Sequence, residues 1–280
     1  MARGFPRYLR LFIGGYHMLS RLILLALVSQ TVFAAPYYRF WRGTKLSGLD
    51  EEGFRKGLNQ VFVPKTVEVG KGKGLLSYLP VLSPRRSSRP AGLPDEVALV
   101  TYSSEDSYQR IRSTPAGKAY SDLHWKYFSK DESRSLVPTR FDESIKNDAA
   151  YDVLYSDKDW QGGHATYRLS SVKGDIETLE SYLRTAREKS KSLGLLSYIV
   201  VVTKNYLYEY QLWDSPNAYR SAYEENSPLG RMSRSLLELI HDDQLKRVEP
   251  GNADLQFGMG ISAAFDQDSP QQCQGPTKTE

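Results

Sequence analysis

Cysteine is nearly missing from this chain of 280 residues, whose single example, Cys273, lies in a polar segment near the end. A disulfide within the chain is therefore excluded, and stability has to come from core packing. A lone thiol in such a segment is also a poor candidate for a nucleophile. Histidine is scarce as well, and His124, His164 and His241 do not show the spacing of a zinc site. The sequence thus predicts no metal centre.

A hydrophobic run long enough to span a membrane is also lacking. The segment Leu22–Phe33, LILLALVSQTVF, has twelve residues, whereas a membrane-spanning helix needs about 20. Four arginines precede this segment and Ala34 ends it in a small-residue cleavage pattern, which predicts a secretory signal peptide over residues 1–34, with a retained anchor as the alternative. A start at Met18 gives a more compact signal. We expect an exported protein, periplasmic or secreted, without stable membrane insertion after cleavage.

Removal of residues 1–34 also removes the excess of positive charge. The full chain has 37 basic and 33 acidic residues, and residues 1–34 hold four of the arginines and no acid. The mature chain is therefore formally neutral. Neutrality removes the electrostatic argument for nucleic acid or an anionic membrane as the partner. The partner we expect is an unidentified small molecule.

One short motif occurs twice, GLLSY at Gly74–Tyr78 and again at Gly194–Tyr198. Before each copy, apolar residues recur at spacings of three and four, which predicts a helix, and a strand precedes that helix at Tyr37–Leu46 and at His164–Val172. After each copy come two strands and a further helical segment. The shared order of strand, helix, strand, strand, helix predicts an α+β protein made of two ferredoxin-like βαββα repeats.

The repeats set the predicted domain boundaries. We place the first repeat at residues 35–140, a linker with a candidate strand YDVLY at 141–163, and the second repeat at 164–250. Residues 251–280 are expected to form a C-terminal edge strand and a disordered tail. Val97–Val100 and Ile199–Val202 are apolar on both faces, so helices should cover one face of each sheet and the other sheet should cover the second face. This predicts a monomer with an internal pseudo-dimer.

The segment YQLWDSPNAYRSAYEENSPLG, which begins at Tyr210, carries a family resemblance. A strand that ends in Trp, followed by an acidic turn and a helix, resembles the third strand and second helix of the antibiotic biosynthesis monooxygenase type of dimeric α+β barrel. The resemblance extends over most of residues 37–249. It implies a tandem fused repeat that packs as an intramolecular dimeric α+β barrel, and it implies no particular substrate.

The first candidate site is a histidine that the second repeat lacks. Aligning the repeats places His124 opposite Leu237 and Tyr120 opposite Ser233, within a helical stripe that faces the core. His124 is either a haem ligand or proton-transfer group, or a core histidine with one hydrogen-bond partner. In the haem-degrading members of the family a helical histidine works with a strand tryptophan and an asparagine. Trp213 matches that tryptophan but lies in the other repeat, and no asparagine stands in either first strand, so we expect no cofactor and keep haem as the alternative.

The second candidate site is polar and lies in the second repeat. Strand alternation puts Glu209, Gln211 and Trp213 on one face. Because the first and third strands of a ferredoxin-like sheet are neighbours, Arg168 should face Glu209. These side chains either bind a polar ligand or move a proton, or they form a structural cross-strand ion pair.

The third candidate is an insertion in the first repeat, Ser83–Pro94, with the sequence SPRRSSRPAGLP. Its arginines, Arg85, Arg86 and Arg89, either contact an acidic partner or belong to a solvated loop tip. Taken together, the residues predict an exported small-molecule-binding protein with no assignable reaction. The alternatives are a monooxygenase or haem-handling enzyme that uses His124, and a structural or docking protein that uses the insertion.

Overall fold

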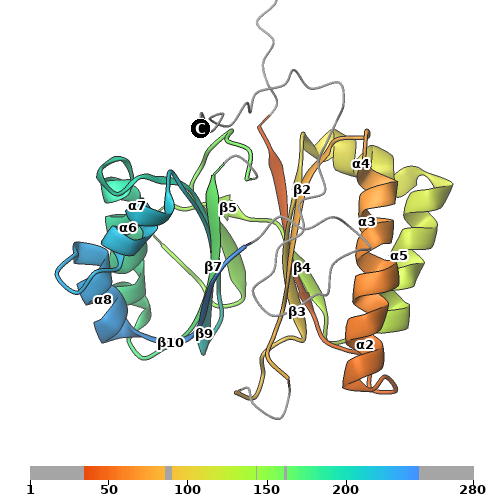
Figure 1. Cartoon of the computed structure of the whole chain (residues 1–280), viewed down its shortest axis with the longest axis horizontal. Helices are drawn as coiled ribbons and strands as arrows, with labels where there is room; N and C mark the ends of the chain where they lie inside the picture. Colours follow the sequence, from red (N-terminus) through yellow and green to blue (C-terminus); the bar gives the residue numbers. More distant parts are fainter. Residues whose placement is uncertain (1–34, 86–89, 143, 161–162, 246–280) are drawn as a thin grey trace, which may run out of the picture. The chain divides into compact units, whose positions relative to one another are not determined.

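The computed structural model describes residues 35–85, 90–142, 144–160 and 163–245 (Figure 1). The predicted signal peptide, Arg86, Arg89 and the predicted C-terminal edge strand and tail lie outside these residues. The described chain contains two β-sheets and a set of helices, which confirms the α+β class. Among its helices, none is both long and apolar enough to cross a membrane.

The first sheet is antiparallel and has the strand order β2-β3-β1-β4. Its strands are β1 (Tyr37–Gly43), β2 (Leu75–Leu82), β3 (Glu96–Tyr102) and β4 (Arg134–Leu136). The helices that connect them are α2 (Glu51–Gly57), the π-helical turn η1 (Leu58–Phe62), α3 (Val63–Gly70), α4 (Glu105–Ser113) and α5 (Pro115–Tyr127). In Figure 1, α3 and α5 lie side by side over one face of this sheet.

The second sheet has the strand order β10-β7-β9-β8-β6-β5. Its strands are β5 (Thr139–Arg140), β6 (Ala149–Leu154), β7 (His164–Val172), β8 (Leu195–Val202), β9 (Tyr206–Trp213) and β10 (Leu237–Gln244), and its helices are α6 (Ile176–Leu193), α7 (Pro216–Ala222) and α8 (Pro228–Leu236). Strands β7 to β10 therefore repeat the order of β1 to β4. Strand β6 contains the first four residues of the candidate strand YDVLY and extends this sheet from within the segment predicted as a linker.

Hydroxyl side chains begin the matching helices of the two halves in the same way. Ser104 accepts a hydrogen bond from the backbone N–H of the third residue beyond it, and Ser215 does so at the corresponding place. Thr114 and Ser227 cap the next helices in the same manner. Each such cap contributes about 1 kcal/mol to helix stability. The matching helices of the two halves thus begin with the same type of cap.

The two copies of GLLSY occupy equivalent places. Gly74 and Gly194 have φ angles of +101° and +71°, a left-handed conformation that glycine adopts without strain. Each glycine follows a helix and leads directly into a strand, β2 or β8. The tyrosines that end the motif, Tyr78 and Tyr198, are both buried and both donate a hydrogen bond to a buried glutamate. The two copies of the pentapeptide therefore have the same local structure, a left-handed glycine that leads into a buried strand.

The two sheets share a hydrophobic core. Phe40 of β1 packs edge-on against Tyr208 and Tyr210 of β9, at ring-centroid distances of 6.2 and 5.6 Å. The Tyr210 hydroxyl donates to the backbone oxygen of Leu79 at 2.9 Å. Separate clusters fill the space between each sheet and its own helices. Both faces of the central strands are thus buried, as their apolar composition predicts.

The structure adds a strand after the last helix of each half, which the predicted βαββα order omits. Helix α5 runs for 13 residues, whereas α8 ends after nine and Leu237 begins β10. The predicted alignment of His124 with Leu237 therefore pairs a helical residue with the first residue of a strand.

Candidate functional site

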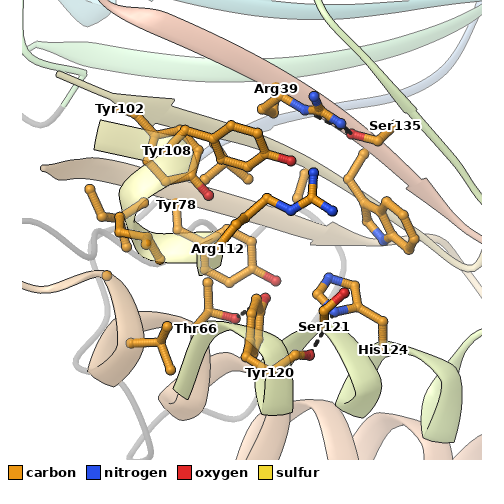
Figure 2. Close-up of a pocket in the computed structure, with 18 of the residues that line it drawn as sticks. Arg39, Thr66, Tyr78, Tyr102, Tyr108, Arg112, Tyr120, Ser121, His124 and Ser135 are labelled. Carbon is orange, nitrogen blue, oxygen red and sulfur yellow. Dashed lines mark hydrogen bonds between the residues drawn. The ribbon is translucent and has the colours of Figure 1, made fainter. Parts of the chain in front are cut away.

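A cavity of about 290 Å³ lies in the first half, between the first sheet and its helices (Figure 2). This volume is at the lower end of the range for small-molecule pockets, which starts at about 300 Å³. Aromatic rings form a large part of its wall. The aromatic and imidazole side chains that line it are Trp41, Phe62, Tyr78, Tyr102, Tyr108, Tyr120, His124 and Trp125.

The sheet and the helices each supply part of the wall. Tyr78 and Tyr102 come from strands β2 and β3, and Tyr120 and His124 lie on α5 on the opposite side (Figure 2). Ala98 of β3 also lines the cavity. Its small side chain leaves room between the rings of the neighbouring residues.

His124 presents a neutral imidazole to the cavity. Its Nδ1 lies 2.9 Å from the backbone oxygen of Tyr120, and because a carbonyl accepts only, Nδ1 carries the proton and Nε2 carries the lone pair. The ring makes edge-on contacts with Phe62 at 4.8 Å and with Trp41 at 5.3 Å. Burial lowers the pKa of His124 to about 4, so the ring is uncharged at neutral pH.

A buried carboxyl group supports the opposite wall. Glu96 is fully buried, and its two oxygens accept hydrogen bonds from the Tyr78 hydroxyl at 2.9 Å and from Trp41 Nε1 at 3.1 Å. Burial raises the pKa of Glu96 to about 8, against the lowering effect of these two donors. The carboxyl group is therefore mostly protonated at pH 7. It fixes two rings of the cavity without adding a full negative charge.

The second half places a polar cluster between its sheet and helices. Arg168 lies directly opposite Glu209 on the neighbouring strands β7 and β9, as the sequence predicts, and Thr166 lies opposite Gln211. Glu209 is fully buried, and its Oε1 accepts hydrogen bonds from tyrosine hydroxyls and from Gln211 Nε2. Trp213 Nε1 lies 3.3 Å from both Thr166 Oγ1 and Gln211 Oε1. The structure thus brings together the four residues predicted for this site, which are Arg168, Glu209, Gln211 and Trp213.

Arg168 does not form the predicted cross-strand ion pair with Glu209 and instead pairs with Asp242. Its guanidinium group forms an ion pair with Asp242 at 3.5 Å and stacks on the ring of Tyr223 at 3.6 Å. Glu209 Oε2 has no hydrogen-bond partner within the described part of the chain. Burial raises the pKa of Glu209, and it outweighs the lowering effect of Arg168. Glu209 and Arg168 therefore face each other without a direct ion pair.

The predicted site residues thus form two separate groups. His124 and Tyr120 line the cavity of the first half, and Trp213 belongs to the polar cluster of the second half. Sequence reasoning missed most of the cavity, including Tyr102 and Tyr108. The alternation of Arg39 and Trp41 along β1 was an available signal, since both residues line the cavity.

A tetrapyrrole does not fit this cavity. Three rings, those of Trp41, Phe62 and Tyr120, pack edge-on or tilted around His124 within 5.3 Å of its centroid. The volume of about 290 Å³ lies at the lower end of the range for small-molecule pockets and leaves little room for a porphyrin. No group of three or more His, Cys, Asp or Glu side chains is placed to bind a metal ion among the described residues.

Arg85 is the one arginine of the predicted docking loop that the structure describes. It is exposed and forms an ion pair with Glu52 at 3.0 Å. Exposed pairs of this kind contribute about 0–1 kcal/mol. This contact links the loop to α2 and leaves the docking role a prediction.

Comparison with known proteins gives distant structural likenesses. No family model and no curated protein matches the chain. A candidate monooxygenase from Lactobacillus acidophilus aligns with a TM-score of 0.42 at 10% identity, over 81% of this chain and 99% of that one. A candidate monooxygenase from Fusobacterium nucleatum gives 0.42 at 12%, over 82% and 98% of the two chains. An anthrone oxidase-like protein gives 0.35 at 9%, over 79% and 95%. Scores at this level do not assign the chain to a family.

Proposed function

We propose that this protein binds a small aromatic molecule in the cavity between its first sheet and helices α3, α4 and α5. The observation that carries the proposal is the cavity wall, in which eight aromatic or imidazole side chains surround about 290 Å³. Rings of this kind bind a flat apolar ligand through edge-to-face and offset contacts. The uncharged imidazole of His124 adds one acceptor that can orient a hydroxyl group.

The proposal includes the finer architecture. We infer that strands β1 to β4 and β7 to β10, each set in the order 4-1-3-2, are two ferredoxin-like repeats fused into one internal barrel. The shared positions of the GLLSY glycines support this inference. Export of the protein is also part of the proposal and rests on the sequence pattern of residues 1–34.

Titration with 2-naphthol, a neutral two-ring probe, tests the proposal. Isothermal titration calorimetry should give one site per chain for the wild type. Ser121 lines the cavity from α5, so Ser121→Trp should fill the space and weaken binding by about tenfold or more. Ser192→Trp, an equally large change at an exposed position of α6, is the matched control and should bind as the wild type does.

Two results would contradict the proposal. One is the absence of binding to the wild type, and the other is equal binding by wild type and Ser121→Trp. Circular dichroism of each variant checks that the fold is retained.

A second candidate function is oxygenation of the bound molecule, with His124 as proton acceptor. The observation that favours it is the unprotonated Nε2, which the hydrogen bond from Nδ1 to Tyr120 leaves available. A low pKa makes His124 a weak base, so the role requires a ligand with an acidic O–H or C–H group. Oxygen uptake on addition of naphthols should then occur with wild type and disappear with His124→Leu. Uptake that persists in the variant removes this function.

A further inference from the structure

Only two of the residues that line the cavity in the described chain carry a charge, and both are arginines. They are Arg39 of β1 and Arg112 of α4. The lining contains no Asp, Glu or Lys. Two cationic side chains without an acidic one at a cavity rich in aromatic rings favour a ligand of negative charge.

Arg39 is held in place by neutral partners. Its Nε and Nη2 donate to the hydroxyl oxygen of Ser135 at 3.1 and 2.7 Å, and its guanidinium carbon lies 4.9 Å from the centroid of the Tyr108 ring. No acidic residue of the described ranges forms an ion pair with it. Ser135 and Tyr108 orient the group and leave its charge uncompensated.

Arg112 approaches the same ring from α4. Its guanidinium carbon lies 5.5 Å from the centroid of Tyr108, and its side chain is exposed. Figure 2 shows the guanidinium groups of Arg39 and Arg112 pointing the same way, past Tyr108 and toward the side of the cavity where His124 lies. Two positive groups on one ring repel each other, and an anion between or beside them would relieve this repulsion.

The other titratable groups of the cavity do not balance this charge. The Glu96 carboxyl group behind Tyr78 is mostly protonated at pH 7, because burial raises its pKa to about 8. His124 is neutral, because burial lowers its pKa to about 4. The potential inside the cavity is therefore positive, and its apolar walls strengthen the effect on a bound ligand.

We propose that the ligand is a small aromatic carboxylate, whose ring fills the cavity and whose carboxylate binds Arg39 and Arg112. A guanidinium group matches the geometry of a carboxylate through paired N–H donors. This inference rests on the proposed function, since it names the chemical class of the same ligand.

A matched pair of probes tests the inference. 2-Naphthoate and 2-naphthamide have the same rings and nearly the same shape, and they differ in charge. Calorimetry of the wild type at pH 7 and low salt should show that the carboxylate binds about tenfold more tightly than the amide. This preference should shrink as ionic strength rises.

Two variants locate the charge. Arg112→Gln changes an exposed residue and should reduce naphthoate affinity by about fivefold, with less than about a twofold effect on naphthamide. The double variant Arg39→Gln, Arg112→Gln should remove the preference. Arg110→Gln, on the same helix but outside the cavity lining, is the matched control and should keep it.

The outcomes separate the two proposals. If both probes bind equally and Ser121→Trp still blocks them, the carboxylate inference is overturned and the aromatic site stands. If Arg112→Gln and the double variant keep the wild-type preference, the inference is overturned as well. If neither probe binds, or both bind Ser121→Trp as they bind wild type, the proposed function fails and the inference fails with it.

Discussion

Ala98 in the first half corresponds to Glu209 in the second half. Each faces the first strand of its own sheet, where Ala98 pairs with Trp41 and Glu209 pairs with Arg168. In the first half, the small side chain leaves room for the cavity. In the second half, the carboxylate occupies the same place and gathers tyrosine hydroxyls around it.

One arrangement of strands thus accommodates two kinds of interior. Both halves keep a buried glutamate bonded to the motif tyrosine, Tyr78 or Tyr198. In the first half the glutamate is Glu96, two residues before Ala98, so that it lies behind the rings and outside the cavity lining. A shift of one carboxyl group by two positions along a strand thus accompanies the change from a filled interior to an open one.

The largest expected effect comes from removing the carboxylate of the second half. Glu209→Ala leaves the buried hydroxyls of Tyr182 and Tyr198 without their acceptor. Because each unsatisfied buried donor costs about 1–3 kcal/mol, we expect the free energy of unfolding to fall by about 2–6 kcal/mol. Urea denaturation of the full chain measures it.

The control for this change is an exposed glutamate. Glu238→Ala breaks the surface pair with Lys173 and should cost about 0–1 kcal/mol. Equal losses for the two variants would show that the cluster of the second half does not stabilise the fold.

A smaller effect is expected on the pH dependence of the free energy of unfolding, through the Glu96 carboxyl group. The pKa of this carboxyl group is about 8 in the folded protein and 4.5 ordinarily, so unfolding releases its proton between these values and its contribution to stability is lost as pH rises. The difference in unfolding free energy between wild type and Glu96→Gln should change by about 2 kcal/mol from pH 6.5 to 8.

In the range from pH 6.5 to 8, stability depends on the titration of Glu96 and not on that of His124. Because the pKa of His124 is lowered from 6.5 to about 4, its contribution is present above pH 6.5 and is lost as pH falls toward 4. A difference between wild type and Glu96→Gln that stays constant from pH 6.5 to 8 would mean that Glu96 is ionised in the folded state.

The smallest expected effect is the change in the Soret spectrum when haemin is added. Because the cavity of the first half is too small for a tetrapyrrole, wild type and His124→Leu should give the same Soret spectrum. Absorption spectroscopy measures it. A Soret shift in the wild type that the variant loses would instead make His124 a haem ligand.

The sequence predicted the parts of this structure that depend on local patterns. The GLLSY motif located two matching turns from helix to strand because a positive φ favours glycine, and strand alternation placed Arg168 opposite Glu209. The lengths of α5 and α8 were not predicted, because a helix ends where tertiary packing stops it. The cavity was not predicted either, since it depends on how side chains of separate elements, such as Ala98 and Tyr108, meet in space.

The π-helical turn η1, at Leu58–Phe62, lies between α2 and α3, and α3 contributes side chains to the cavity. A π-helical turn holds one more residue than the α-helical turn it replaces. Since each helical residue advances the direction of its side chain by about 100°, the extra residue sets which side chains of α3 face the sheet. Thr66 and Val69 line the cavity in this register. Loss of one residue from η1 would turn other side chains of α3 inward, so a change of length, rather than of chemistry, would give the pocket a different wall.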